Sequence, residues 1–98
     1  MPKFIIEREV PGAGDLSQEE IKGIFEYGLG ITKEIGPEIE WVQSYITGDK
    51  VYCEFIATDE EMLREHARKT GFPANKISKV ATIVTHATLA SKPESSVY

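Results

Sequence analysis

Cysteine and long apolar runs are scarce in this chain of 98 residues. Its one cysteine, Cys53, leaves no partner for a disulfide within the chain. No apolar run approaches the ~20 residues that a membrane-spanning helix needs, and the N-terminus lacks the charged and then apolar layout of a signal peptide. The sequence therefore predicts a cytoplasmic protein without a membrane partner, of a length that suits a single domain.

Basic residues are also too few for nucleic-acid binding. The chain has 11 Lys and Arg residues against 16 Asp and Glu residues, a net charge of -5, and no basic patch is visible along it. Such a surface repels a phosphate backbone. Residues 12–14 (Gly-Ala-Gly) are not followed by Lys and then Ser or Thr, so they do not form a phosphate-binding loop. We expect no nucleic-acid partner.

Apolar spacing and turn residues predict six elements in the order β-α-β-β-α-β. Ser17 and Glu20 form a capping box at the start of the first helix, and Thr58 and Glu61 form another at the start of the second. Gly71 suits the left-handed conformation that ends a helix. The elements are strands over residues 3–10, 39–46, 51–57 and 76–84 and helices over 17–35 and 58 to about 70.

The last dozen residues differ in composition from the rest and turn to Thr, Ser, Lys, Pro and Glu. We therefore expect a domain over residues 1–85 and a C-terminal tail over residues 86–98, which is flexible or forms an arm to a partner subunit.

Three glycines lie inside the first predicted helix: Gly23, Gly28 and Gly30. Each costs ~1 kcal/mol relative to alanine in a helix interior. Either the helix backbone packs closely on the sheet at these glycines or the helix is irregular, and we expect close packing.

This element order predicts an α+β fold of the ferredoxin-like type, a four-stranded antiparallel sheet with both helices on one face. The other face must then be covered by something else. In a dimeric α+β barrel, two such sheets pack face to face around a shared interior, and we expect this arrangement here.

The predicted hairpin of strands 39–46 and 51–57 sorts its side chains into two faces. A Gly-Asp turn that pairs Thr47 with Lys50 sets the register, and alternate residues point to opposite faces. The face under the helices is predicted to hold Val42, Ser44, Ile46, Val51, Cys53, Phe55 and Ala57. The other is predicted to hold Trp41, Gln43, Tyr45, Tyr52, Glu54 and Ile56.

The first strand adds a carboxylate to this second face. We expect Glu7 there, because a carboxylate under the helices would lack solvent or a partner. Arg8 then lies at the edge of the helix-covered face, where a long side chain can snorkel to water.

Two runs of the chain, PKFIIEREVPGAGDLSQEE and IEWVQSYITGDKVYCEFIATDEEMLREHARKTGFPANKISKV, together with their spacing, resemble a family of small bacterial proteins long filed as a domain of unknown function. One branch is described as nickel-binding, with a ferredoxin-like fold that dimerises. The resemblance implies this fold, a homodimer and nickel as a cofactor. The helix and turn around His66 carry the likeness to that branch, which has a further histidine where this sequence has Phe72.

The candidate site residues follow from these placements. His66 is the candidate metal ligand, and nickel would need further donors from Glu7, Glu54, Glu65 or Cys53. The alternative for His66 is a packed imidazole at the border of helix and sheet, and Cys53 is best read as a small buried apolar residue. The candidate ligand-binding residues are Glu7, Trp41, Tyr45, Tyr52, Glu54 and Arg64.

The two carboxylates allow two interpretations. Burial and mutual repulsion between Glu7 and Glu54 would raise the pKa of one of them. Alternatively, they form ion pairs with Arg8, Arg64 or Lys79 at a subunit contact.

Three functions fit these residues. The first is a homodimeric binding protein that takes a metal ion or a small ligand between its sheets. The second is a cofactor-independent isomerase or oxygenase, in which Glu7 or His66 moves a proton and Tyr45 or Tyr52 donates to developing oxyanion charge. The third is an accessory or regulatory subunit without a small ligand.

Overall fold

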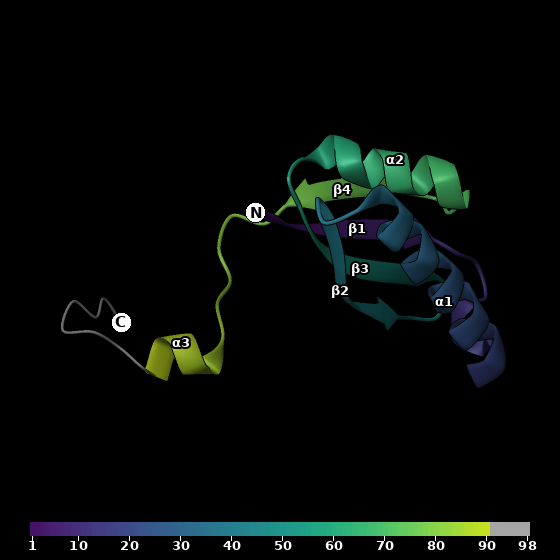
Figure 1. The fold of residues 1–98 in the computed structure, drawn as a ribbon. Helices are drawn as coiled ribbons and strands as arrows, with labels where there is room; N and C mark the ends of the chain where they lie inside the picture. The colour runs from purple at the N-terminus through teal and green to yellow at the C-terminus, as the bar shows by residue number, and fades with distance from the viewer. Residues whose placement is uncertain (91–98) are drawn as a thin grey trace.

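Two helices cover one face of a four-stranded antiparallel sheet in the computed structural model of the chain (Figure 1). The structure describes residues 1–90. The strands are β1 (Lys3–Glu9), β2 (Ile39–Ile46), β3 (Lys50–Ala57) and β4 (Lys76–Lys79). The helices are α1 (Gln18–Ile35), α2 (Glu60–Thr70), the short α3 (His86–Ala90) and a 3-10 turn, η1 (Ala13–Asp15). Within residues 1–90, no helix is both long and apolar enough to cross a membrane.

The strands lie in the order β2-β3-β1-β4, and each neighbouring pair is antiparallel. This order follows from a hairpin, β2-β3, flanked by two crossovers that each carry a helix. The α+β class and the ferredoxin-like order predicted from the sequence are therefore confirmed.

Capping groups define the helix ends. The Ser17 hydroxyl accepts from the backbone N–H of Glu20 at 3.1 Å, and the Glu20 carboxylate accepts from the backbone N–H of Ser17 at 2.8 Å, which confirms the first capping box. Gly71 ends α2 with φ at 79°, as predicted. The second helix start differs by one residue, because the Asp59 carboxylate caps Met62 N–H at 3.1 Å in place of Thr58.

The core lies between the sheet and the two helices. Alternate residues of β1, together with β3 and α2, supply most of it, and Ile6 and Leu63 are completely buried. The core residues are Phe4, Ile6, Ala13, Ile39, Val51, Cys53, Phe55, Ala57 and Leu63.

A β-bulge at Val42 changes the predicted faces of β2. From Ile46 to Gln43 the register with β3 is the predicted one, but Trp41 then pairs with Phe55, so Val42 is the extra residue. The insertion reverses the alternation. The predicted faces of Trp41 and Val42 are therefore wrong: Trp41 lies under the helices, and Val42 is 38% exposed.

Strand β4 is shorter than predicted, because its partner strand ends. Its last bond to β1 runs from Val80 N–H to the carbonyl of Lys3 at 2.8 Å, and β1 begins at Lys3. Residues 81–89 are exposed, and α3 lies apart from the two layers (Figure 1). The predicted tail includes residues 91–98, which lie outside the described residues.

Of the three glycines in α1, only Gly28 packs closely, and it packs on Phe72, which follows α2, and not on the sheet as predicted. A Cβ at Gly28 would lie 3.3 Å from the ring of Phe72. A Cβ at Gly23 or Gly30 would meet nothing within 4 Å, so the close-packing expectation is wrong at those two positions.

This difference predicts unequal gains in stability from the same substitution. Gly23→Ala and Gly30→Ala should each raise the free energy of unfolding by about 1 kcal/mol, because alanine is the better helix former. Gly28→Ala should gain less than half as much, because its methyl group crowds Phe72. Urea denaturation of the three variants checks this, and an equal gain at Gly28 would contradict the packing described here.

Candidate functional site

Glu54 lies at the centre of the sheet face that carries no helix within residues 1–90. This surface, the open face, includes Lys3, Ile5, Glu7, Glu9, Glu40, Gln43, Tyr45, Lys50, Tyr52, Glu54, Ile56, Lys76 and Ser78. Oε1 of Glu54 accepts from Gln43 Nε2 at 2.7 Å and from the Tyr45 hydroxyl at 2.8 Å, and Oε2 lies 3.2 Å from Lys3 Nζ. The side chains around it leave Glu54 only 9% exposed.

These contacts hold Glu54 as an anion. The hydrogen bonds from Gln43 and Tyr45, and then the Lys3 ammonium, lower the pKa of its carboxyl. The prediction that crowding raises a pKa in this carboxylate pair is therefore wrong for Glu54. In return, the hydrogen bond to Glu54 raises the pKa of the Tyr45 hydroxyl, which stays a phenol and a donor.

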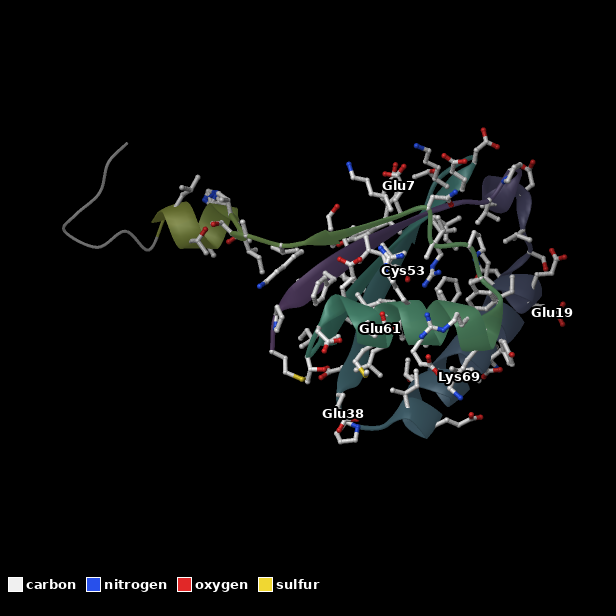
Figure 2. All side chains as sticks on the ribbon, turned by 90° about the horizontal axis from the view of Figure 1, so that it is seen from above. Glu7, Glu19, Glu38, Cys53, Glu61 and Lys69 are labelled. Atoms are coloured by element: carbon white, nitrogen blue, oxygen red, sulfur yellow. The ribbon has the colours of Figure 1, made fainter. Side chains whose placement is uncertain are left out.

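Glu7 has a cation of its own on the same face. The register sets Glu7 opposite Tyr52 and confirms that it lies on the open face (Figure 2). Its carboxylate lies 3.0 Å from Lys50 Nζ, and this hydrogen bond raises the pKa of the Lys50 ammonium. Both ion pairs of the open face thus form within one chain.

The sequence reasoning missed these two lysines as partners and expected Arg8, Arg64 or Lys79 in their place. The period of two along β1 could have found Lys3, because it sets Lys3 and Glu7 on one face. Lys50 could have been found from the register of β1 with β3, which sets Lys50 opposite Glu9 and on the same face as Glu7.

Three of the predicted site residues do not reach the open face. Trp41 stacks on Phe25 of α1 with ring centroids 5.6 Å apart. Arg64 lies on the outer side of α2 and pairs with Glu60, with 2.9 Å between Arg64 Nε and the carboxylate. His66 is buried between α2 and the sheet. The structure therefore brings together Glu7, Tyr45, Tyr52 and Glu54 and separates them from Trp41, Arg64 and His66.

His66 is a packed imidazole in this structure. Its Nε2 donates to the carbonyl of Gly28 at 3.1 Å, and its ring lies 5.3 Å from that of Phe55. Its Nδ1 is buried without a hydrogen-bond partner. Burial lowers the pKa of His66, so the neutral form prevails at pH 7.

The surroundings of His66 do not fit a nickel ion. Nδ1 carries a free lone pair, but residues 1–90 contain no group of three or more His, Cys, Asp or Glu side chains placed to hold a metal. A nickel ion needs several nitrogen or oxygen donors. Residues 1–90 of one protomer therefore do not bring together the donors that the predicted site around His66 needs.

Burial of neutral His66 predicts a pH dependence of stability. Its pKa is depressed in the folded state, so the unfolded chain binds the proton more readily, and the free energy of unfolding falls as the pH drops below 6.5. Urea denaturation from pH 6.5 to about 5.5 should show this loss in the native chain. The loss should vanish in His66→Gln and persist in His86→Gln, because His86 is exposed. An unchanged slope in His66→Gln would contradict this assignment.

Comparison with known proteins identifies the family. No curated protein sequence matches the chain significantly. A solved structure, SCO4226 from Streptomyces coelicolor A3(2), is 14% identical and aligns with a TM-score of 0.71 over 84% of this chain and 99% of its own, a likeness of fold. The family model described as "Nickel responsive protein SCO4226-like" matches residues 4–80. The chain therefore belongs to the SCO4226-like family of nickel responsive proteins.

Proposed function

We propose that this protein is a homodimeric binding protein of the nickel response, in which the open faces of two copies enclose a ligand chamber. The observation that carries the proposal is the composition of the open face. Tyr45 is 52% exposed there, and Tyr52, Ile5 and Ile56 are only partly buried, on a surface that no helix covers within residues 1–90. Such a surface suits burial against a partner.

The charges of the open face favour a second copy as that partner. Lys3 neutralises Glu54, and Lys50 neutralises Glu7. Two identical faces can then approach without the repulsion that a net charge of -5 would cause if it were spread over the contact. The polar groups at the centre would line the chamber, and the apolar rings around them would exclude water.

A nickel ion in this chamber would need donors from both copies. One protomer offers no cluster of three donors in residues 1–90, but it presents the carboxylates of Glu7 and Glu54 on one face. Pairing two such faces doubles that set. We propose that nickel binding, where it occurs, depends on the dimer and on Glu54 and does not involve His66. The isomerase or oxygenase alternative stays a prediction from the sequence.

The dimer is tested with two tyrosines that are almost equally exposed. Tyr45 lies on the open face at 52% exposure, and Tyr27 lies on α1 at 50%. Tyr45→Arg should convert the dimer to a monomer, because it places two new cations, one from each copy, in one contact. Tyr27→Arg should remain a dimer. Light scattering after gel filtration measures the mass in solution, which is compared with the chain mass of 10.9 kDa.

A native chain that is monomeric at micromolar concentration, or a Tyr45→Arg variant that still dimerises, would overturn the proposed chamber. A Tyr27→Arg variant that dissociates would instead assign the contact to the helical side.

Nickel binding is tested by calorimetric titration of untagged protein with NiCl2. We expect one nickel ion per two chains, with affinity at least about tenfold weaker in Glu54→Gln, because a charged oxygen donor is lost. His66→Gln should bind as the native chain does, since its imidazole lies on the other side of the sheet. Absence of heat in the native dimer, or loss of binding in His66→Gln, would contradict the nickel assignment.

A further inference from the structure

Arg8 is the most unusual residue on the helix side of the sheet. It belongs to β1 and is only 5% exposed. The sequence led us to expect that the Arg8 side chain snorkels to water, and this expectation is wrong. Its Nη1 donates to the carbonyl of Pro73 at 2.7 Å, and its Nε donates to Cys53 Sγ at 3.4 Å. Its guanidinium carbon lies 5.8 Å from the ring centroid of Phe72.

None of these partners balances the charge of Arg8. Within residues 1–90, the ion pairs involve other cations, and no carboxylate lies within 4 Å of the guanidinium. A thiol sulfur and a backbone carbonyl are neutral acceptors. A buried cation without a counter-ion is costly, because its hydration is lost and no anion replaces it.

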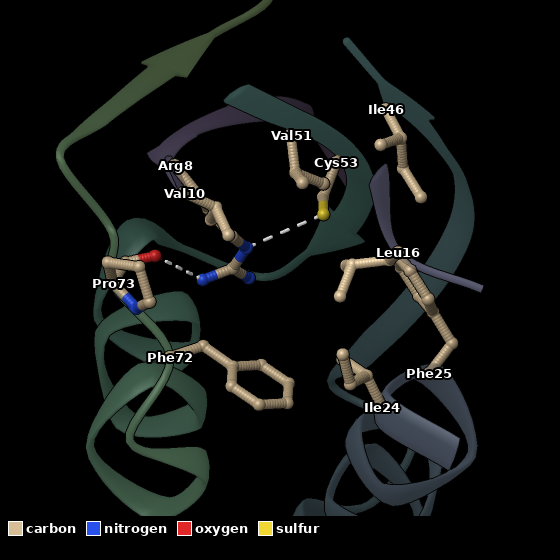
Figure 3. A pocket seen from close by; sticks show the side chains of 10 residues that line it. All are labelled: Arg8, Val10, Leu16, Ile24, Phe25, Ile46, Val51, Cys53, Phe72 and Pro73. Carbon is tan, nitrogen blue, oxygen red and sulfur yellow. Dashed lines mark hydrogen bonds between the residues drawn. The ribbon is translucent and has the colours of Figure 1, made fainter. Parts of the chain in front are cut away.

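A cavity of about 160 Å³ lies beside this cation, between α1, the sheet and the turn that follows α2. Figure 3 shows the Arg8 guanidinium at its edge, with two nitrogens bonded to Pro73 and Cys53 and the third directed into the space between Phe72 and Leu16. The rest of the wall is apolar: Leu16, Ile24, Phe25, Ile46, Val51 and Phe72.

We propose that this cavity binds a small monocarboxylate with an aromatic or branched aliphatic body, whose carboxylate pairs with Arg8. The third nitrogen, Nη2, carries two N–H groups that make no hydrogen bond within residues 1–90, and a carboxylate can accept from both. The apolar wall receives the body of the ligand. An apolar cavity of ~150 Å³ is large enough for a benzene ring, so the size favours a ligand with one ring or a short branched chain.

The charge of the chain makes this recognition specific. A protein of net charge -5 attracts no anion through its general field. A carboxylate must therefore gain its affinity from Arg8 itself, and a neutral molecule of the same shape gains only from the apolar wall. This site lies on the opposite face of the sheet from the proposed chamber, so neither depends on the other.

Benzoate is the probe, and the chain is followed by two-dimensional amide NMR. We expect saturable shifts at the amides of Arg8, Leu16 and Phe72, with benzamide binding roughly tenfold more weakly or worse. Arg8→Met should fold, because it removes a buried cation that lacks a counter-ion, and it should weaken benzoate binding to the level of benzamide. Leu16→Trp keeps Arg8 but fills the cavity, and it should also lose binding.

Arg68→Met is the matched control, because Arg68 lies exposed on α2 and pairs with Glu61, and it should bind benzoate as the native chain does. Absence of shifts with benzoate, shifts confined to the open face, or equal binding of benzoate and benzamide would overturn the proposal. So would unchanged affinity in Arg8→Met.

Discussion

The bulge at Val42 is the constraint on which both faces of the sheet depend. By adding one residue to β2, it turns Trp41 under α1 while Gln43 and Tyr45 remain on the open face. A regular strand would have put the indole beside Tyr45 and left a gap over Phe25. The bulge therefore gives the helix side its largest ring and leaves the open face to hydrogen-bonding groups.

A row of hydrogen-bonded side chains runs from Trp41 to Arg8 on the helix side of the sheet. The indole N–H of Trp41 donates to Ser44 Oγ at 2.9 Å, and Ser44 donates to Cys53 Sγ at 3.0 Å. Arg8 donates to the same sulfur from the opposite side. Cys53 thus accepts two hydrogen bonds. The interpretation of Cys53 as a small buried apolar residue did not predict them. This chain of donors ends at the guanidinium beside the cavity.

The order of residues and the alternation along strands predict most of the fold. The predictions fail where a β-bulge changes the register or where the contacts of a long side chain determine the structure. Capping residues and apolar spacing predicted the helices, and the Gly-Asp turn predicted the register as far as Gln43. The bulge has no signal in the alternation, since Trp41 and Val42 are both acceptable on either face. The partners of Glu54 and Glu7 depend on where flexible lysines reach across the sheet, which a pattern of residue types does not encode. Arg8 was misjudged because its acceptors, a thiol and the carbonyl of Pro73, carry no charge to mark them.

Family membership and the chemistry of individual residues have to be kept apart in this protein. The helix around His66 carried the resemblance to nickel-binding relatives, yet this imidazole holds α2 to α1 through the carbonyl of Gly28. A Cβ at Gly28 would press on Phe72, and the absence of a side chain there lets the two helices approach closely enough for that bond. The same histidine therefore serves the packing on which the sheet rests. Within residues 1–90, the carboxylates that converge from neighbouring strands are instead Glu7 and Glu54 of the open face.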